Sequence, residues 1–492
     1  MSPRAALGGA LAALLVAAAC GSTVNQPTER AVGGQSISGA DTAPTTAAVA
    51  PGVTDASAPV AGGGLATSPG AAPAAGGTAA PQSGATAAPV STGPLELGFL
   101  TTAVSNASAF GATLGSNLPE RSVINALLGQ LNKAGGIGGR KLVPVFSDTD
   151  TGGANWDAQF AAACAAFTED HHVAAVLGYV FGQSDALEQC LTNKRIPHLS
   201  ATFGTPDAGA MTRAPYLFDI ASPTIERRSE LKVDGAIAAG LLDRNSKLGI
   251  VMDGCPDTTT SWSRTVKPYI ESRGIPIATV FQLGCPHGAG DAAAEVGKVG
   301  NLVLQLRAAG VDRIIFHAES EGPAVFVVAN AAEPQGYRPL YLVSSLAQTA
   351  VLGSQIPPAQ AANVHGFGWM PLNDAKRPQW PALTPAAARC LDLLSRGGIV
   401  PSSAVDYATA LFTCDAVFLY QEALAATGGR TDGPSVAAAI EAMGPRHASA
   451  LTIDGRSLFG PGHHDGPVDV RRFDYQAGCA CYAYRPETRA IP

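Results

Sequence analysis

From Pro94 onward, short apolar runs alternate with stretches of helical periodicity, and this alternation constrains the fold more than any other feature of the chain. Strands are predicted at 95–100, 141–146, 173–178, 196–201 and 216–220, with helices near 117–134, 155–169 and 184–194. The pattern then restarts, with strands predicted at 247–253, 279–283, 313–318 and 341–345 and helices near 224–243, 260–273, 292–309 and 322–335. Alternating strands and helices favour parallel sheets covered by helices on both faces. The sequence therefore predicts two α/β halves in tandem.

The remainder of the chain predicts a return to these two halves. A strand-like run at 363–370 is followed by helices near 382–396, 402–427 and 433–443, and strand signals reappear at 450–455 and in the closing segment 468–485. A terminal β element that follows helices is placed most easily by completing an earlier sheet. We expect the chain to cross between the lobes more than once, with 94–220 plus 346–455 forming the N-terminal lobe and 221–345 plus 456–492 the C-terminal lobe.

Residues 21–93 consist almost wholly of Ala, Gly, Pro, Ser and Thr, with no aromatic residue. Such a stretch buries too little apolar surface to offset the entropy of ordering it. The sequence predicts a disordered tether here.

The N-terminus has the pattern of an export signal. Arg4 precedes the run LGGALAALLVAAAC, which ends in small residues before Cys20. A positive charge, an apolar stretch of about a dozen residues and a small-residue cleavage site are typical of a secretory signal, too short to span a membrane permanently. The cysteine after three alanines resembles a bacterial lipobox, which implies a lipid on Cys20 that anchors the protein to the outer face of the cell membrane. Ala17-Ala18-Ala19 also fits an ordinary A-x-A cleavage site, and both interpretations predict an extracytoplasmic protein.

Eight cysteines remain when Cys20 is set aside, and an even number in an oxidising compartment suggests disulfides. Proximity in sequence favours two pairs, Cys255 with Cys285 and Cys390 with Cys414. A bond between Cys479 and Cys481 is a third option, although a C-x-C bridge is strained. An alternative is a metal site at Cys479 and Cys481 with His463 or His464, although this spacing is shorter than metal ligands usually show. The loop containing His463, His464 and Asp465 is expected to face solvent.

Charge and motifs exclude several function classes. The formal net charge is −7 without a basic stripe, so no nucleic-acid partner is expected. The chain contains no G-x-S-x-G elbow, no H-E-x-x-H and no Gly-rich loop that leads from a strand into a helix. We therefore expect a protein that is not an enzyme and needs no cofactor or metal.

The segment INALLGQLNKAGGIGGRKLVPVFSDTD at 124–150 closely resembles a signature of the branched-chain-amino-acid-type ABC transporter substrate-binding lipoproteins of the type 1 periplasmic binding protein family. Looser similarity in the same order follows at 173–206, 215–228 and 407–429, so the resemblance covers about residues 94–455. It implies two Rossmann-like lobes with parallel central sheets, several interlobe crossings and a cleft. It also implies a disulfide between Cys164 and Cys190, a monomeric protein, and a membrane permease and ATPase as partners.

Ligands of open parallel sheets bind beyond the carboxyl ends of the strands, which places the site in the cleft. An amino-acid carboxylate prefers hydroxyls and backbone N–H groups at a helix N-terminus; the resemblance implies this role for Ser184, Ser200 and Thr202. It also implies that Glu319 or Glu321 binds the ammonium group. The complete set of predicted ligand-binding residues is Thr101, Thr102, Tyr179, Phe181, Gln183, Ser184, Ser200, Ala201, Thr202, Asp253, Glu319 and Glu321.

Roles without ligand contact stay open for these residues. A serine at a helix start can be only an N-cap, and the two glutamates can be solvated loop charges. The function expected is capture of a small amino-acid-like or carboxylate ligand by lobe closure for an ABC importer. A sensing module of the same fold and, less favoured, a hydrolase are the alternatives.

Overall fold

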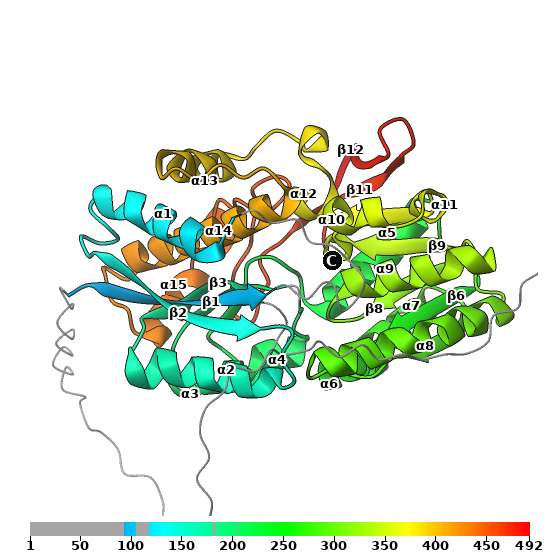
Figure 1. The fold of residues 1–492 in the computed structure, drawn as a ribbon, viewed down its shortest axis with the longest axis horizontal. Coiled ribbons are helices and arrows are strands. Elements are labelled where there is room, and N and C mark those ends of the chain that lie inside the picture. The colour runs from blue at the N-terminus through cyan, green and yellow to red at the C-terminus, as the bar shows by residue number, and fades with distance from the viewer. Residues whose placement is uncertain (1–92, 105–117, 181–183, 203) are drawn as a thin grey trace, which may run out of the picture. The chain divides into compact units, whose positions relative to one another are not determined.

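The computed structural model describes residues 93–104, 118–180, 184–202 and 204–492 (Figure 1). Its first sheet has five parallel strands in the order β2-β1-β3-β4-β5. The strands are β1 (Leu95–Val104), β2 (Leu142–Asp150), β3 (Ala175–Val180), β4 (His198–Thr202) and β5 (Leu217–Asp219). All five predicted strands of the first half are thereby confirmed.

Helices cover both faces of this sheet, as Figure 1 shows. One face carries α1 (Glu120–Lys133), α13 (Pro385–Arg396), α14 (Ala404–Ala426) and α15 (Gly433–Glu441); the other carries α2 (Trp156–Ala165) and α3 (Asp185–Asn193). Helix α14 is buried along most of its length because Ala, Leu, Phe and Val occupy more than half of its positions. The short α4 (Ala208–Arg213) lies between β4 and β5 in sequence.

The second sheet has seven strands in the order β12-β11-β10-β9-β8-β6-β7. They are β6 (Leu248–Met252), β7 (Ile277–Gln282), β8 (Arg313–His317), β9 (Leu340–Ser344), β10 (Val364–Gly368), β11 (Asp469–Gln476) and β12 (Cys481–Ala490). The first five in chain order are parallel, and β11 and β12 add an antiparallel hairpin at one edge. The helices of this lobe are α5 (Ile225–Ala238), α6 (Pro256–Ser261), α7 (Lys267–Ser272), α8 (Ala289–Ala308), α9 (Glu321–Ala332), α10 (Thr349–Leu352) and α11 (Pro358–Ala361).

One boundary of the predicted division into lobes is wrong, and so is one predicted strand. Strand β10 pairs in parallel with β9, Val364 opposite Tyr341, so the segment from 346 to the end of β10 adds to the second sheet instead of the first. The short connection through α10 and α11 returns the chain to the neighbouring strand position. The predicted strand at 450–455 is also absent: those residues form turns, beside an isolated bridge between Ala448 and Arg456.

Within the described residues, three segments connect the lobes: 220–224, the stretch that contains α12 (Pro371–Asp374), and 447–468. Hydrogen bonds tie them together. Trp369 donates its indole N–H to the Ala221 carbonyl at 2.7 Å and accepts at its own carbonyl from the Ile453 N–H at 2.7 Å. These bonds make the connections one crosslinked unit about which the lobes can move.

The loop at 463–465 belongs to this unit, so its expected exposure to solvent is wrong for two of its residues. Asp465 is 3% exposed and accepts from the Thr224 N–H at 2.7 Å, while His464 is 6% exposed and stacks on the ring of Phe218 at a centroid distance of 4.1 Å. A Gly/Pro-rich sequence indicates a loop, but it does not say whether the loop crosses the surface or a hinge.

The four expected disulfides are all present: Cys164–Cys190, Cys255–Cys285, Cys390–Cys414 and Cys479–Cys481. The first joins α2 to α3 and the third joins α13 to α14, helices that follow each other on the same face of the first sheet. The last pair closes the turn between β11 and β12, which removes the thiolates that the alternative metal site required. Among the described residues, no helix is both long and apolar enough to cross a membrane.

Stability should fall as pH rises from about 6.5 to about 9, because of one buried histidine. His447 is 1% exposed, and its ring lies 2.9 Å from the Glu422 carboxylate and 3.4 Å from that of Asp415. Despite burial, these carboxylates raise its pKa to about 9. A pKa above the unfolded value of about 6.5 contributes stability that is complete below 6.5 and lost above 9, at most about 3 kcal/mol. Urea unfolding of the wild type at pH 6, 7.5 and 9.5 should show this loss, whereas His447→Gln should show a smaller pH dependence; equal slopes would contradict it.

Candidate functional site

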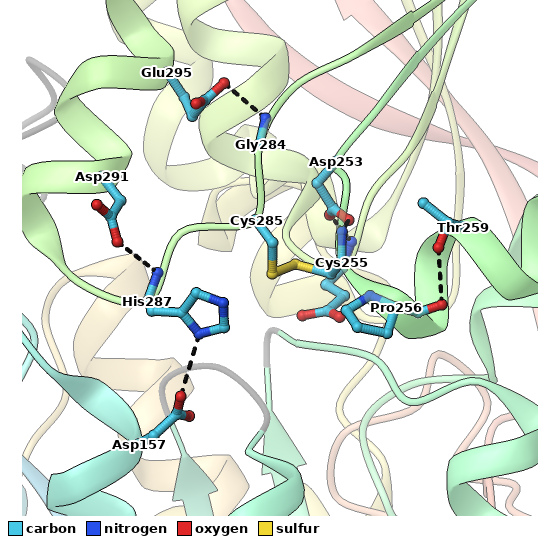
Figure 2. The surroundings of a disulfide bond; sticks show 11 residues. Asp157, Asp253, Cys255, Pro256, Thr259, Gly284, Cys285, His287, Asp291 and Glu295 are labelled. Atoms are coloured by element: carbon cyan, nitrogen blue, oxygen red, sulfur yellow. Dashed lines mark hydrogen bonds and ion pairs between the residues drawn. A yellow bond between two sulfur atoms is a disulfide. The ribbon is translucent and has the colours of Figure 1, made fainter. Parts of the chain in front are cut away.

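A cavity of about 580 Å³ lies where the carboxyl ends of the two sheets meet. The first lobe contributes the N-terminal turns of α2 and α3; the second contributes the loops after β6, β7 and β8 with the first half of α8 and part of α9. Figure 2 shows the wall formed by the loops after β6 and β7, which the Cys255–Cys285 disulfide joins. Both sheets share the strand order 2-1-3-4-5, and β6 and β8 flank the point where the order of the second sheet reverses, the usual ligand position in such sheets.

Two carboxyl groups meet at that reversal point. Asp253 follows β6 and Glu319 follows β8, and each places a carboxylate oxygen within 4.8 Å of the other. The Glu319 N–H donates to Asp253 Oδ2 at 2.8 Å, and the Cys255 N–H donates to Oδ1 at 3.2 Å. Burial raises the pKa of both groups, and for Glu319 the charge of Asp253 raises it further. The hydrogen bonds of Glu319 within the described chain involve only its backbone, so its carboxylate is available to a ligand.

The carboxyl pair and Cys255 do not make a three-ligand group with a thiolate. The Cys255 sulfur lies close enough to both carboxylates to complete a three-ligand group. It is bonded to Cys285, however, and a metal ion requires a thiolate. Two carboxylates alone remain.

Arg228 lies in the protein interior behind the loop that carries Glu319 and holds this loop in place. Its guanidinium is fully buried and donates to Thr205 Oγ1 at 2.9 Å, to the Ala318 carbonyl, and to the Glu319 carbonyl at 3.4 Å. Because these donors are directed at backbone and hydroxyl oxygens, the cation positions the loop without occupying either carboxylate.

Ser184 lies at the other side of the cavity, at the N-cap position of α3. Its side chain caps no helix N–H, and its hydroxyl oxygen is buried, with no hydrogen-bond partner among the described residues; the residue is 4% exposed. The interpretation as a simple N-cap is therefore wrong. A buried hydroxyl without a partner costs free energy unless a ligand or water satisfies it.

Direct contacts between the lobes close one edge of the cavity. The Trp156 N–H donates to the His287 carbonyl at 3.0 Å, and the Ala289 N–H donates to the Gly153 carbonyl at 3.2 Å. The His287 ring lies 3.2 Å from the Asp157 carboxylate, an ion pair that Figure 2 shows joining the loop before α8 to the start of α2. These bonds describe a state in which the lobes are in contact.

Of the predicted ligand-binding residues whose side chains the structure describes, three line the cavity: Ser184, Asp253 and Glu319. Glu321 does not, since its side chain is fully buried, 3.2 Å from Lys232 Nζ, and accepts from the Ser344 N–H. It is a buried structural charge, and this contradicts both the ligand interpretation and the solvated one.

Thr101, Thr102, Ser200 and Ala201, on β1 and β4, also lie outside the cavity lining. The Thr101 hydroxyl donates to Asp148 at 2.5 Å, and the Thr102 N–H donates to Glu120 at 2.8 Å. Ser200 and Ala201 are buried within β4. Phe181 and Gln183, and the side chains of Tyr179 and Thr202, lie outside the described residues.

The part of the lining that comes from α2, the loop after β7, α8 and α9 was not predicted from the sequence. These residues include Trp156, Asp157, Phe160, Leu283, His287, Val296, Val299, Ala324 and Val327. The loop after β7 could have been found by the same strand-end rule that identified Asp253. The helix residues could not, because which helix turn faces the cleft depends on how each helix packs on its sheet.

The described chain forms two α/β lobes built on mainly parallel sheets and joined by three crossings. The lobes share a cavity at the carboxyl ends of their strands, and this architecture defines a bilobal binding protein. The family model described as periplasmic binding protein matches residues 94–485, and the chain belongs to this extracytoplasmic family. No curated protein sequence matches the chain.

Solved structures share this fold at low sequence identity. A solute-binding protein of an ABC transporter from R. palustris, in complex with 4-hydroxybenzoate, is 14% identical with a TM-score of 0.58, covering 81% of this chain and 98% of its own. A possible leucine/isoleucine/valine-binding protein from Rhodopirellula baltica is 14% identical (TM-score 0.56, 83% and 98% covered). A fatty acid ABC transporter substrate-binding protein from Thermomonospora curvata is 16% identical (TM-score 0.57, 82% and 97% covered).

Proposed function

We propose that this chain captures a small solute outside the cytoplasm and delivers it to the permease and ATPase of an ABC importer. The observation that carries the proposal is the cavity between the lobes, with carboxylates from one lobe and a hydroxyl without a partner from the other. A solute that contacts both lobes stabilises the closed state over the open one, and this difference drives closure. A lipid on Cys20 would keep a monomeric protein at the outer face of the membrane, close to its permease.

The polar groups suit an amino-acid-like head group. An ammonium group would lie against Asp253 and Glu319. A carboxylate would accept from the Ser184 hydroxyl at the positive end of α3. That Ser184 and Glu319 come from opposite lobes supports a head group that bridges them.

A thermal-shift screen tests the proposal. The purified protein would be screened against amino acids, aromatic acids, fatty acids and amines. At least one solute is expected to raise the melting temperature by several degrees, which mass action produces for a ligand that binds only the folded state. Its affinity should fall about 10- to 100-fold in Glu319→Gln or Ser184→Ala, the loss expected when a buried polar contact is removed.

The matched control is Glu487→Gln on β12, an exposed acid far along the chain from the cavity loops. Its affinity should equal that of the wild type. A screen without any stabilising solute, or a solute whose affinity both cavity variants leave unchanged, would contradict the proposed function.

A further inference from the structure

The cavity is larger than a head group needs, and the excess space is apolar. Beyond Asp253 and Glu319 it extends between α8 and α9 above β6. We call this part the apolar compartment, lined by Val251, Leu283, Val296, Val299, Ala324 and Val327. Burying this surface contributes most to the binding free energy when the ligand itself has a large apolar part.

The charged groups on the lining are almost all acidic, and most already have partners. The Asp257 carboxylate accepts from Arg213 at 2.9 Å. The Glu295 carboxylate accepts from the Gly284 N–H at 2.7 Å and from Lys298. Glu319 is left with a carboxylate that accepts no hydrogen bond within the described residues.

Cations are scarce at the same surface. Among the described lining residues, the His287 imidazole is the one basic side chain, and it faces Asp157 at the cavity edge. Arg228 is buried behind the loop and donates to the carbonyls of Ala318 and Glu319. A ligand carboxylate placed beside Asp253 and Glu319 would therefore meet like charge, while the Arg228 guanidinium behind the loop is directed at carbonyl oxygens, and this placement is unfavourable.

We propose that the solute is an organic amine with an extended apolar body, whose ammonium group binds between Asp253 and Glu319 while the body fills the apolar compartment. This inference rests on the proposed function and narrows its ligand class: a carboxylate without an ammonium group is the class it disfavours. The hydroxyl of Ser184 remains available to a second polar substituent of the same solute.

Proton linkage gives an independent readout. The groups that face the carboxyl pair are Arg228, Asp257 and Asp185. Burial keeps the pKa of both Asp253 and Glu319 above the ordinary value, and the charge of Asp253 raises that of Glu319 further. An ammonium group favours the ionised carboxylates, so binding releases a proton from the pair. The affinity for an amine should therefore rise as pH increases from 5 to 7.5, and that for a carboxylate should not.

The experiment compares n-hexylamine, n-propylamine and hexanoate by isothermal titration calorimetry on the full-length protein. Hexylamine is expected to bind at least tenfold more tightly than propylamine, because three additional methylenes are buried, and at least tenfold more tightly than hexanoate. Glu319→Gln should weaken hexylamine binding at least tenfold. Ala324→Phe, which fills the apolar compartment, should weaken hexylamine far more than propylamine, and Glu487→Gln should change neither.

Circular dichroism and the melting temperature of each ligand-free variant verify its folding, and the comparison of two amines within one variant does not depend on stability. Hexanoate binding as tightly as hexylamine, hexylamine failing to bind, or Ala324→Phe weakening both amines equally would each overturn the inference. If the thermal-shift screen yields a carboxylate without an ammonium group, and its binding depends on Ser184, the proposed function stands and this inference fails. If no solute binds in either experiment, both fail.

Discussion

Gly288→Ala is expected to lower solute affinity about 10- to 100-fold while the ligand-free protein unfolds at nearly the wild-type temperature. Gly288 has extended backbone at φ −173°, which alanine adopts, but an added Cβ would lie 2.4 Å from the carbonyl oxygen of Ala154 in the other lobe. Backbone cannot yield as a flexible side chain does, so the lobes must separate. Overpacking of this kind costs about 1–3 kcal/mol, and here the cost falls on the closed state alone, which lowers affinity by the corresponding factor.

The matched control is Gly290→Ala, two residues further along the same segment, where an added Cβ meets nothing within 4 Å. Titration calorimetry should give wild-type affinity for Gly290→Ala and a weaker one for Gly288→Ala. X-ray scattering should show a larger radius of gyration for Gly288→Ala in the presence of solute. Equal affinities in the two variants would show that the contact between Gly288 and Ala154 plays no part in solute binding.

Lys232→Met is expected to destabilise the protein by about 3–5 kcal/mol, the usual result of leaving a buried charge without its partner. Both Lys232 and Glu321 have fully buried side chains, 3.2 Å apart, and Lys232 also donates to the Phe316 carbonyl of β8. Removing the ammonium group leaves the Glu321 carboxylate with Ser344 as its remaining partner.

A double-mutant cycle separates this charge effect from lost packing. Lys232→Met combined with Glu321→Gln should regain more than half of the stability that Lys232→Met loses, because a buried pair replaced as a whole is often nearly neutral. Urea denaturation of all four proteins provides the free energies of unfolding. A double variant no more stable than Lys232→Met would indicate that the lysine acts through its packing.

The sequence was informative wherever a local pattern decides the structure. Apolar runs bounded by turn residues predicted the ten parallel strands, and cysteine proximity together with the family resemblance predicted all four disulfides. The strand run at 363–370 was also correct, but its sheet was not, because strand pairing depends on contacts that a single run does not contain.

Prediction of the ligand-binding residues was limited because the sequence does not show in which direction each side chain points. Glu319 and Glu321 are two residues apart; one lines the cavity and the other is buried against Lys232. A rule based on strand ends selects the loop and cannot distinguish these two. Ser184 lines the cavity, as expected, because the start of a helix beyond a strand end is a position that sequence alone can locate.

The central claim is that solute binds behind the contact between the two lobes, and a crosslink across that contact tests it most directly. Asp157 and His287 face each other from opposite lobes, with their side chains 3.2 Å apart (Figure 2), so cysteines introduced at both positions can be joined by a short bismaleimide crosslinker. When the double variant is crosslinked in the presence of solute, we expect dissociation during dialysis to slow at least a hundredfold relative to the His287→Cys single variant. Release at the same rate from both proteins would mean that the solute does not lie between the lobes.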